Sequence, residues 1–256
     1  GALKNIAIGH EALSDLTTGD DNVCIGAYAG DAMTDNKENI AIGTASLTTA
    51  DSGENYNIAI GYESMKYANT AGIDYNVAIG NGALTGGTGE LQGNIAIGHG
   101  ALDATSTNEQ IGTIGIGYRA LGGLSSGEGN LAIGYDAGLL LTAGDKNTIL
   151  GNYGLDAANA GETNNVAIGY GAMSLVDEGE NAGSDTVAAD GNIAIGAYAL
   201  MGGDMGDASS SSGANRHFSD NIAIGRNAMD STAANPQTGT IAIGADALGA
   251  LTSGAG

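Results

Sequence analysis

Apolar and polar residues follow a pattern that repeats along the whole chain in units of about 18 residues. Each unit contains a short apolar run of the form N-I-A-I-G, then x-x-A-L, then a polar loop rich in Thr, Asp, Gly and Asn. The glycine that closes the apolar run lies at Gly9, Gly26, Gly43, Gly61, Gly80, Gly98, Gly117, Gly134, Gly151, Gly169, Gly196, Gly225 and Gly244. A fixed internal period of this length predicts a solenoid of stacked, similar coils.

Within each unit, the two isoleucines are spaced two residues apart, as in Ile40 and Ile42, which places both side chains on one face of a strand. The closing glycine turns the chain, and x-x-A-L then returns a leucine or methionine toward the interior. These inward positions are Leu13, Leu47, Met65, Leu84, Leu102, Leu121, Leu155, Met173, Leu200, Met229 and Leu248. We therefore predict an all-β fold, a parallel β-solenoid (β-roll or β-helix) of about 13 coils of about 18 residues, forming one array over residues 1–256.

The residue between the two isoleucines is small in twelve of the thirteen units, and Ile149 is the bulky exception. We expect the isoleucines to fill the coil's own interior and the small face to meet partner chains in a homotrimer. The positions assigned to the trimer interface are Ala7, Cys24, Ala41, Ala59, Ala78, Ala96, Gly115, Ala132, Ala167, Ala194, Ala223 and Ala242. The alternative is that the small residue fits a tight bend within a monomeric solenoid.

An asparagine opens most strands and is expected to stack in register as a ladder of side-chain amides along the solenoid axis. The positions are Asn5, Asn22, Asn39, Asn57, Asn76, Asn94, Asn130, Asn165, Asn192 and Asn221, with Thr113 and Thr240 replacing asparagine twice.

Composition narrows the function. The chain has 46 glycines, one Phe and no Trp, so its interior must be thin. A net charge of -22 argues against nucleic acid and anionic membrane surfaces as partners. No run approaches the 18 apolar residues of a membrane span, so we expect no membrane insertion. Cys24 is the only cysteine, and we interpret it as a small buried filler.

The N-I-A-I-G-x-x-A-L units resemble two groups of known repeats. One is the N-x-A-x-G-x-x-A-L array of bacteriophage tail fibres, and the other is the S-V-A-I-G head repeat of trimeric autotransporter adhesins. The resemblance covers nearly the whole chain and implies a homotrimeric β-roll or β-helix. The x-x-A-L extension and the spacing of 17 to 19 residues favour the tail-fibre relatives.

Two features are candidates for receptor contact. An irregular aromatic stripe follows the turn glycines, and aromatic rings offer apolar faces on which sugar rings can stack. The alternative, which the pattern favours, is that the stripe covers the coil corner. Loop insertions near residues 174–191 and 201–220 depart from the repeat length, and function concentrates in such loops, unless the insertion has no partner at all. The residues we assign to receptor contact are Arg216, His217, Phe218, Tyr118, Tyr135 and Tyr170.

Catalytic motifs, metal-binding patterns and cofactor fingerprints are missing from the sequence, so we expect no enzyme activity, metal or cofactor. The leading hypothesis is a structural and adhesive fibre segment, part of a longer fibre, that presents surfaces to a cell-surface glycan or protein receptor. A bacteriophage tail fibre on the virion surface is the first hypothesis. The alternatives are a trimeric autotransporter-type adhesin on the bacterial surface and, from another class, a trimeric β-helix polysaccharide depolymerase.

Overall fold

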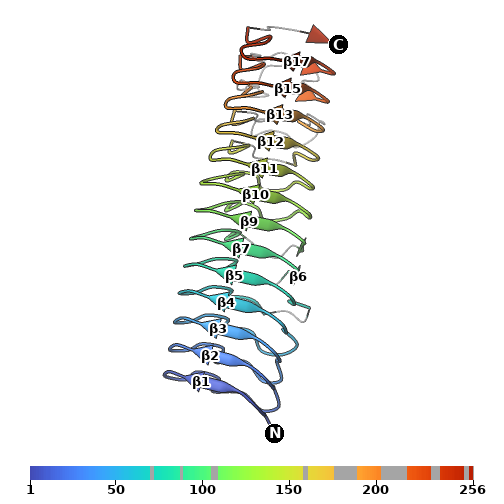
Figure 1. The fold of residues 1–256 in the computed structure, drawn as a ribbon. Coiled ribbons are helices and arrows are strands. Elements are labelled where there is room, and N and C mark those ends of the chain that lie inside the picture. Colours follow the sequence, from blue (N-terminus) through green and yellow to red (C-terminus); the bar gives the residue numbers. More distant parts are fainter. Residues whose placement is uncertain are drawn as a thin grey trace, which may run out of the picture. The chain divides into compact units, whose positions relative to one another are not determined.

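The computed structural model describes residues 1–69, 72–86, 89–104, 109–157, 161–175, 189–202, 218–231, 237–250 and 254–255. It divides into two compact units, Gly1–Gly129 and Asn130–Gly256. Each unit is a stack of similar coils, and within each unit the strands of successive coils lie one above another (Figure 1). The described residues form strands and turns without an α-helix, which confirms the predicted parallel β-solenoid in both units.

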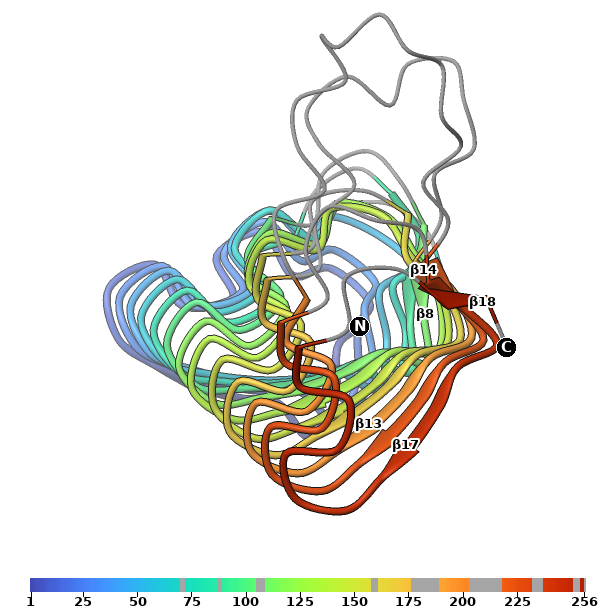
Figure 2. The ribbon, with the colours of Figure 1, turned by 90° about the horizontal axis from the view of Figure 1, so that it is seen from above.

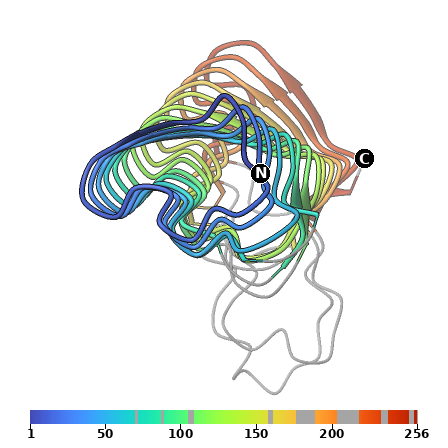
Figure 3. The same cartoon turned by 90° about the horizontal axis from the view of Figure 1, so that it is seen from below.

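The first unit contains seven three-residue strands that pair in parallel in the order β1-β2-β3-β4-β5-β7-β9. They are β1 (Ile6–Ile8), β2 (Val23–Ile25), β3 (Ile40–Ile42), β4 (Ile58–Ile60), β5 (Val77–Ile79), β7 (Ile95–Ile97) and β9 (Ile114–Ile116). On another side of the coil, β6 (Leu91–Gln92) pairs with β8 (Gln110–Ile111). Figure 3 shows the coils of this unit following nearly the same outline.

The second unit repeats this arrangement with β10 (Leu131–Ile133), β11 (Thr148–Leu150), β12 (Val166–Ile168), β13 (Ile193–Ile195), β15 (Ile222–Ile224) and β17 (Ile241–Ile243). A second ladder contains β14 (Phe218–Ser219), β16 (Gln237–Thr238) and β18 (Gly254–Ala255), and Figure 2 shows β14 and β18 at a different corner of the coil from β13 and β17. The two longest repeats keep the register, because Ala167 pairs with Ala194 and Ala194 with Ala223.

The strand side chains point in the opposite directions to those expected from the sequence. The middle residue faces the coil interior: those at 24, 41, 59, 78, 96, 132, 167, 194 and 223 have no exposed surface, Ala242 has 2%, and Gly115 is also buried. Ala7 is exposed, and its strand is paired on one side only. The isoleucines instead point outward, with Ile133 40% exposed and Ile79 37%. The buried small residues therefore fill the interior of their own coil, so their assignment to a trimer interface is wrong.

The reason for this orientation is the narrow space inside the coil, where the strand faces the alanine of x-x-A-L across a gap that holds little more than two methyl groups. The exceptional strand residue Ile149 shows this directly. Its coil has Gly154 in place of that alanine, and a Cβ added there would lie 2.8 Å from Ile149 Cγ2. The two isoleucines of a strand could not both fit such an interior, whereas one methyl group does.

The leucine or methionine of x-x-A-L points inward as predicted, and ten of the eleven predicted positions are buried. The exception is Leu248, which is 44% exposed in the coil of β17, the last strand of its ladder. Two coils have glycine in this slot, Gly30 and Gly138, and a residue three positions later is fully buried, Met33 in one and Leu141 in the other. The sulfur atoms of Cys24 and Met33 both lie next to Gly30: a Cβ added there would be 2.8 Å from Cys24 Sγ and 3.0 Å from Met33 Sδ.

The predicted amide ladder is present in each unit. Asn57 is representative: its backbone N–H and its side-chain Nδ2 donate to Asn39 Oδ1 at 2.9 and 3.2 Å, and Nδ2 also donates to the carbonyl of Ile73 at 2.7 Å. Its own Oδ1 accepts the equivalent two bonds from Asn76. Asn147, which the sequence pattern did not single out, makes the same contacts in the second unit. Asn57 and Asn147 thus each link three consecutive coils.

Where threonine replaces asparagine at Thr113, another side-chain amide takes over the missing bond. Thr113 continues the ladder through its backbone N–H, which donates to Asn94 Oδ1 at 2.9 Å. The missing side-chain amide is supplied three residues earlier by Gln110, whose Nε2 donates to the carbonyl of Leu124 at 2.6 Å. The second threonine, Thr240, also has a buried glutamine three residues before it.

Left-handed backbone conformations close each coil. The residues two and four positions after the strand-ending glycine have φ near +50° in every coil, even where they are leucine, as in Leu47 (φ 51°). Each such leucine costs about 1–2 kcal/mol, which a hydrogen bond to the next coil helps to offset, as from Leu47 N–H to the carbonyl of Ser64 at 3.0 Å. The strand-ending glycine is obligatory, because a Cβ on Gly43 (φ 136°) would overlap the carbonyl of Gly61.

Candidate functional site

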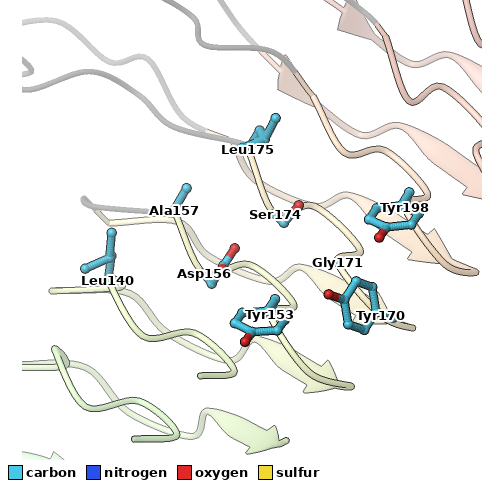
Figure 4. Close-up of a pocket in the computed structure, with 9 residues that line it drawn as sticks. All are labelled: Leu140, Tyr153, Asp156, Ala157, Tyr170, Gly171, Ser174, Leu175 and Tyr198. Carbon is cyan, nitrogen blue, oxygen red and sulfur yellow. The ribbon is translucent and has the colours of Figure 1, made fainter. Parts of the chain in front are cut away.

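The strongest candidate site is a groove on the surface of the second unit, with a volume of about 310 Å³. Its walls come from successive coils, with tyrosines along one side and leucines along the other (Figure 4). The lining residues are Leu140, Tyr153, Asp156, Ala157, Tyr170, Gly171, Ser174, Leu175 and Tyr198.

The tyrosine wall is a continuous herringbone of rings. Tyr135, Tyr153, Tyr170 and Tyr198 pack edge to face, with successive ring centroids 5.4, 5.6 and 5.4 Å apart. These residues lie alternately one and two positions after the turn glycine, so each ring fits beside the previous one instead of stacking directly on it. Tyr170 remains 48% exposed and Tyr198 40%, which leaves ring surface open to a ligand.

The opposite wall is aliphatic and the middle of the groove is polar. Leu140 and Leu175 lie six positions after their turn glycines and are 51% and 47% exposed. Asp156 and Ser174, five positions after theirs, lie between the two walls (Figure 4). Gly171 keeps the groove open, because a Cβ there would lie 3.0 Å from the Tyr198 ring.

Asp156 is the carboxylate of this groove. Burial raises its pKa from 3.8 to about 6, and the nearby negative charge of Asp136 acts in the same direction. The pKa of the Tyr153 hydroxyl is also raised, mainly by desolvation and further by the neighbouring tyrosines and acids. Desolvation is the largest cause of both shifts, and Asp136 and Asp156 add negative charge beside Tyr153.

The residues predicted to contact a receptor separate into four groups, one of which lies outside the described residues. Tyr135 and Tyr170 belong to the tyrosine wall, whereas Tyr118 lies in the first unit, with its ring centroid 5.2 Å from that of His99 and the Arg119 guanidinium over its face. Phe218 is only 1% exposed, because it fills the coil interior three residues before Asn221, so its assignment to receptor contact is wrong.

Arg216 and His217 lie outside the described residues, as do residues 176–188 and 203–217 of the two insertions.

Sequence reasoning found the tyrosines but missed the other half of the groove, Leu140, Asp156, Ser174 and Leu175. A signal was present, since Leu140 and Leu175 occupy equivalent positions after the turn glycine. The loops that hold them differ in composition, which obscures this correspondence.

A buried carboxylate in the first unit is a separate feature. Glu54 has no exposed surface, and its Oε2 accepts a hydrogen bond from Asn36 Nδ2 at 2.7 Å. Burial raises its pKa from 4.5 to about 7, although that hydrogen bond opposes the shift. Ile73 and Leu91 occupy the equivalent slot in later coils, so Glu54 faces the same interior that is apolar there and has no open surface for a ligand.

Within the described part of the chain, no three His, Cys, Asp or Glu side chains gather as a metal-binding group. The same residues include no helix with the length and hydropathy needed to span a bilayer. Comparisons with protein-family models, curated proteins and solved structures find no match to the chain.

Proposed function

We propose that the chain is a segment of a structural and adhesive fibre, in which copies associate through the outward isoleucine rows and expose the opposite side of the coil to a receptor. The observation that carries this proposal is the apolar outer face of the strands, which we call the isoleucine face. It consists of the first and third residues of β1, β2, β3, β4, β5, β7 and β9 in the first unit, and of β10, β11, β12, β13, β15 and β17 in the second.

The isoleucine face is as large as apolar patches that often serve as interaction sites. With strands about 4.8 Å apart, seven strands carrying two outward side chains each give a strip of about 30 by 10 Å, on the order of 300 Å² in the first unit alone. The largest apolar patch on a typical soluble monomer covers about 300–600 Å² and is often functional. All but one of these outward residues are aliphatic, the exception being Thr148, and none is charged.

A second copy of the same chain suits this face best, for two reasons. Its rows have the same axial spacing, so side chains can interdigitate over every coil. The chain also carries a net charge of -22, and two such chains repel each other except where the contact is uncharged. The number three comes from the resemblance to tail-fibre and autotransporter head repeats.

Light scattering on the full chain tests the assembly. We expect a trimer at micromolar concentration and dissociation when lysine is introduced on the face in both units, as in the double variant Ile79→Lys and Ile133→Lys. The control is Tyr67→Lys, at a residue of the loop after x-x-A-L that is 49% exposed, somewhat more than Ile79 (37%) and Ile133 (40%). Circular dichroism verifies that all variants stay folded. A monomeric wild-type chain, or a double variant that still assembles, would falsify the proposal.

Presentation rather than catalysis is supported by the groove, because Asp156 is the one carboxylate among the described residues of its lining. Glycoside hydrolysis ordinarily needs two carboxyl groups across the scissile bond. Incubation with bacterial surface polysaccharide separates the alternatives: release of reducing ends would establish a depolymerase. A tail fibre on the virion surface is our first assignment, and an adhesin on the bacterial surface is the second.

A further inference from the structure

From the composition of the groove, we propose that it binds a neutral carbohydrate chain, whose sugar rings stack on Tyr170 and Tyr198 while Asp156 and Ser174 bond the hydroxyl groups. This inference names the receptor chemistry of the proposed function. It does not depend on self-association, because all lining residues belong to one unit of one chain.

The two walls and the middle of the groove match the two kinds of surface on a sugar ring. A pyranose has an apolar face of C–H groups and a polar rim of hydroxyls. Exposed tyrosine rings and the exposed leucines Leu140 and Leu175 can cover the apolar face. The Asp156 carboxylate accepts hydrogen bonds from hydroxyl groups, and the Ser174 hydroxyl both donates and accepts them.

Other ligand classes fit less well. A purely aliphatic ligand would bury Asp156 and Ser174 without giving them hydrogen-bond partners, which is costly. An anionic ligand, such as a phosphate, a sulfate or a sialylated glycan, would meet Asp156, the neighbouring Asp136 and the overall charge of -22. The charge therefore selects against acidic sugars and favours neutral hexose or N-acetylhexosamine units.

The repeat geometry favours a chain of sugars over a single ring. Successive tyrosines are 5.4 to 5.6 Å apart and come from consecutive coils, so they form a row along the stack. The volume of about 310 Å³ lies at the lower end of the range for ligand pockets, which suits a shallow site that holds part of a longer polymer.

Binding is tested with a panel of immobilised ligands. It contains neutral hexose and N-acetylhexosamine chains, sialylated and sulfated oligosaccharides, and, as a non-carbohydrate ligand, a lysine-rich peptide. We expect the neutral chains alone to bind. Saturation-transfer NMR on the chains that bind then identifies the contact. Saturation of the tyrosine ring protons should reduce the signals of the C–H protons on the sugar ring more than those of protons far from the ring.

Variants locate the site. Tyr170→Ala should raise the dissociation constant about tenfold, the loss of one stacking face, and Asp156→Asn should weaken binding less, because an amide still bonds hydroxyls. The control is Tyr62→Ala, a tyrosine of the first unit with similar exposure (51%).

Failure of every neutral chain to bind, preference for the anionic chains or the peptide, or equal losses in Tyr170→Ala and Tyr62→Ala would overturn the inference. Glycan binding by a chain that scatters light as a monomer would leave the inference intact and reject the trimer. Assembly without glycan binding would do the reverse.

Discussion

The pair Ile149 and Gly154 offers the sharpest test of how the coil interior is filled. Ile149 is fully buried, and Gly154 replaces the alanine that faces the strand in most other coils. Gly154→Ala introduces a Cβ 2.8 Å from Ile149 Cγ2, about 1 Å closer than carbon atoms normally pack. Gly154 has no left-handed φ, so the effect is purely steric, and overpacking of this kind costs about 1–3 kcal/mol.

Ile149→Ala removes three buried carbon atoms and leaves a cavity that is widened by the glycine opposite. Such changes cost about 2–5 kcal/mol, and three carbon atoms at about 0.8 kcal/mol each already account for the lower value. The double variant recreates the Ala/Ala pair of Ala194 and Ala199. We therefore expect its free energy of unfolding to lie within about 2 kcal/mol of wild type, because the net loss is two buried carbon atoms at about 0.8 kcal/mol each. The separate costs, in contrast, sum to about 5 kcal/mol.

Urea unfolding followed by far-UV circular dichroism measures all four corners of this cycle at one protein concentration. Ala199→Gly serves as the control, because its coil carries Ala194 on the strand and the change only removes a methyl group. If the double variant is as unstable as the sum of the single variants, the strand residue does not face the x-x-A-L alanine, and our account of the inverted strand faces is refuted.

Three further predictions concern the backbone and the buried polar groups. Asn57→Ala breaks the ladder and leaves buried donors and acceptors unpaired at about 1–3 kcal/mol each, so its denaturation midpoint should fall steeply, whereas Asn81→Ala, at an exposed asparagine, should change it little. Glu54→Gln should stabilise the chain above pH 7 and not below pH 4: the raised pKa of Glu54 contributes stability at low pH that is lost as pH rises from 4.5 to about 7, worth up to about 3 kcal/mol. Equal pH profiles of unfolding free energy for the two proteins would contradict this. Gly43→Ala should prevent folding because its Cβ overlaps the next coil, while Gly93→Ala, with open space around its Cβ, should cost only about 1 kcal/mol and still give a folded circular dichroism spectrum.

The sequence alone was sufficient for the class of fold, because the repeat requires each coil to bury its apolar residues against the next. It also predicted the asparagine ladder and the inward leucines, whose roles depend on residue type and spacing. The division into two compact units had no counterpart in the repeat pattern.

The direction of the strand faces was predicted wrongly, since period-2 alternation separates two faces without saying which one faces the coil interior. The available clue was that Ile149, the one bulky middle residue of a strand, lies in the coil where Gly154 replaces the alanine of x-x-A-L. A large side chain at one position and none at the other indicates that the two positions face each other. The groove was predicted in part: tyrosines following a turn glycine are visible in sequence, whereas a leucine wall formed by loop residues of neighbouring coils depends on three-dimensional stacking.

The constancy of the strand register across β12, β13 and β15 has a consequence for how such a chain can change. The strands Val166–Ile168, Ile193–Ile195 and Ile222–Ile224 stay aligned although the repeats between them are about ten residues longer than the rest. Peptides of different length and composition can therefore be exchanged after x-x-A-L while the strands keep their pairing and register. Such a molecule can diversify its outer surface in evolution, or accept an engineered peptide there, without a change in the strands that form its scaffold.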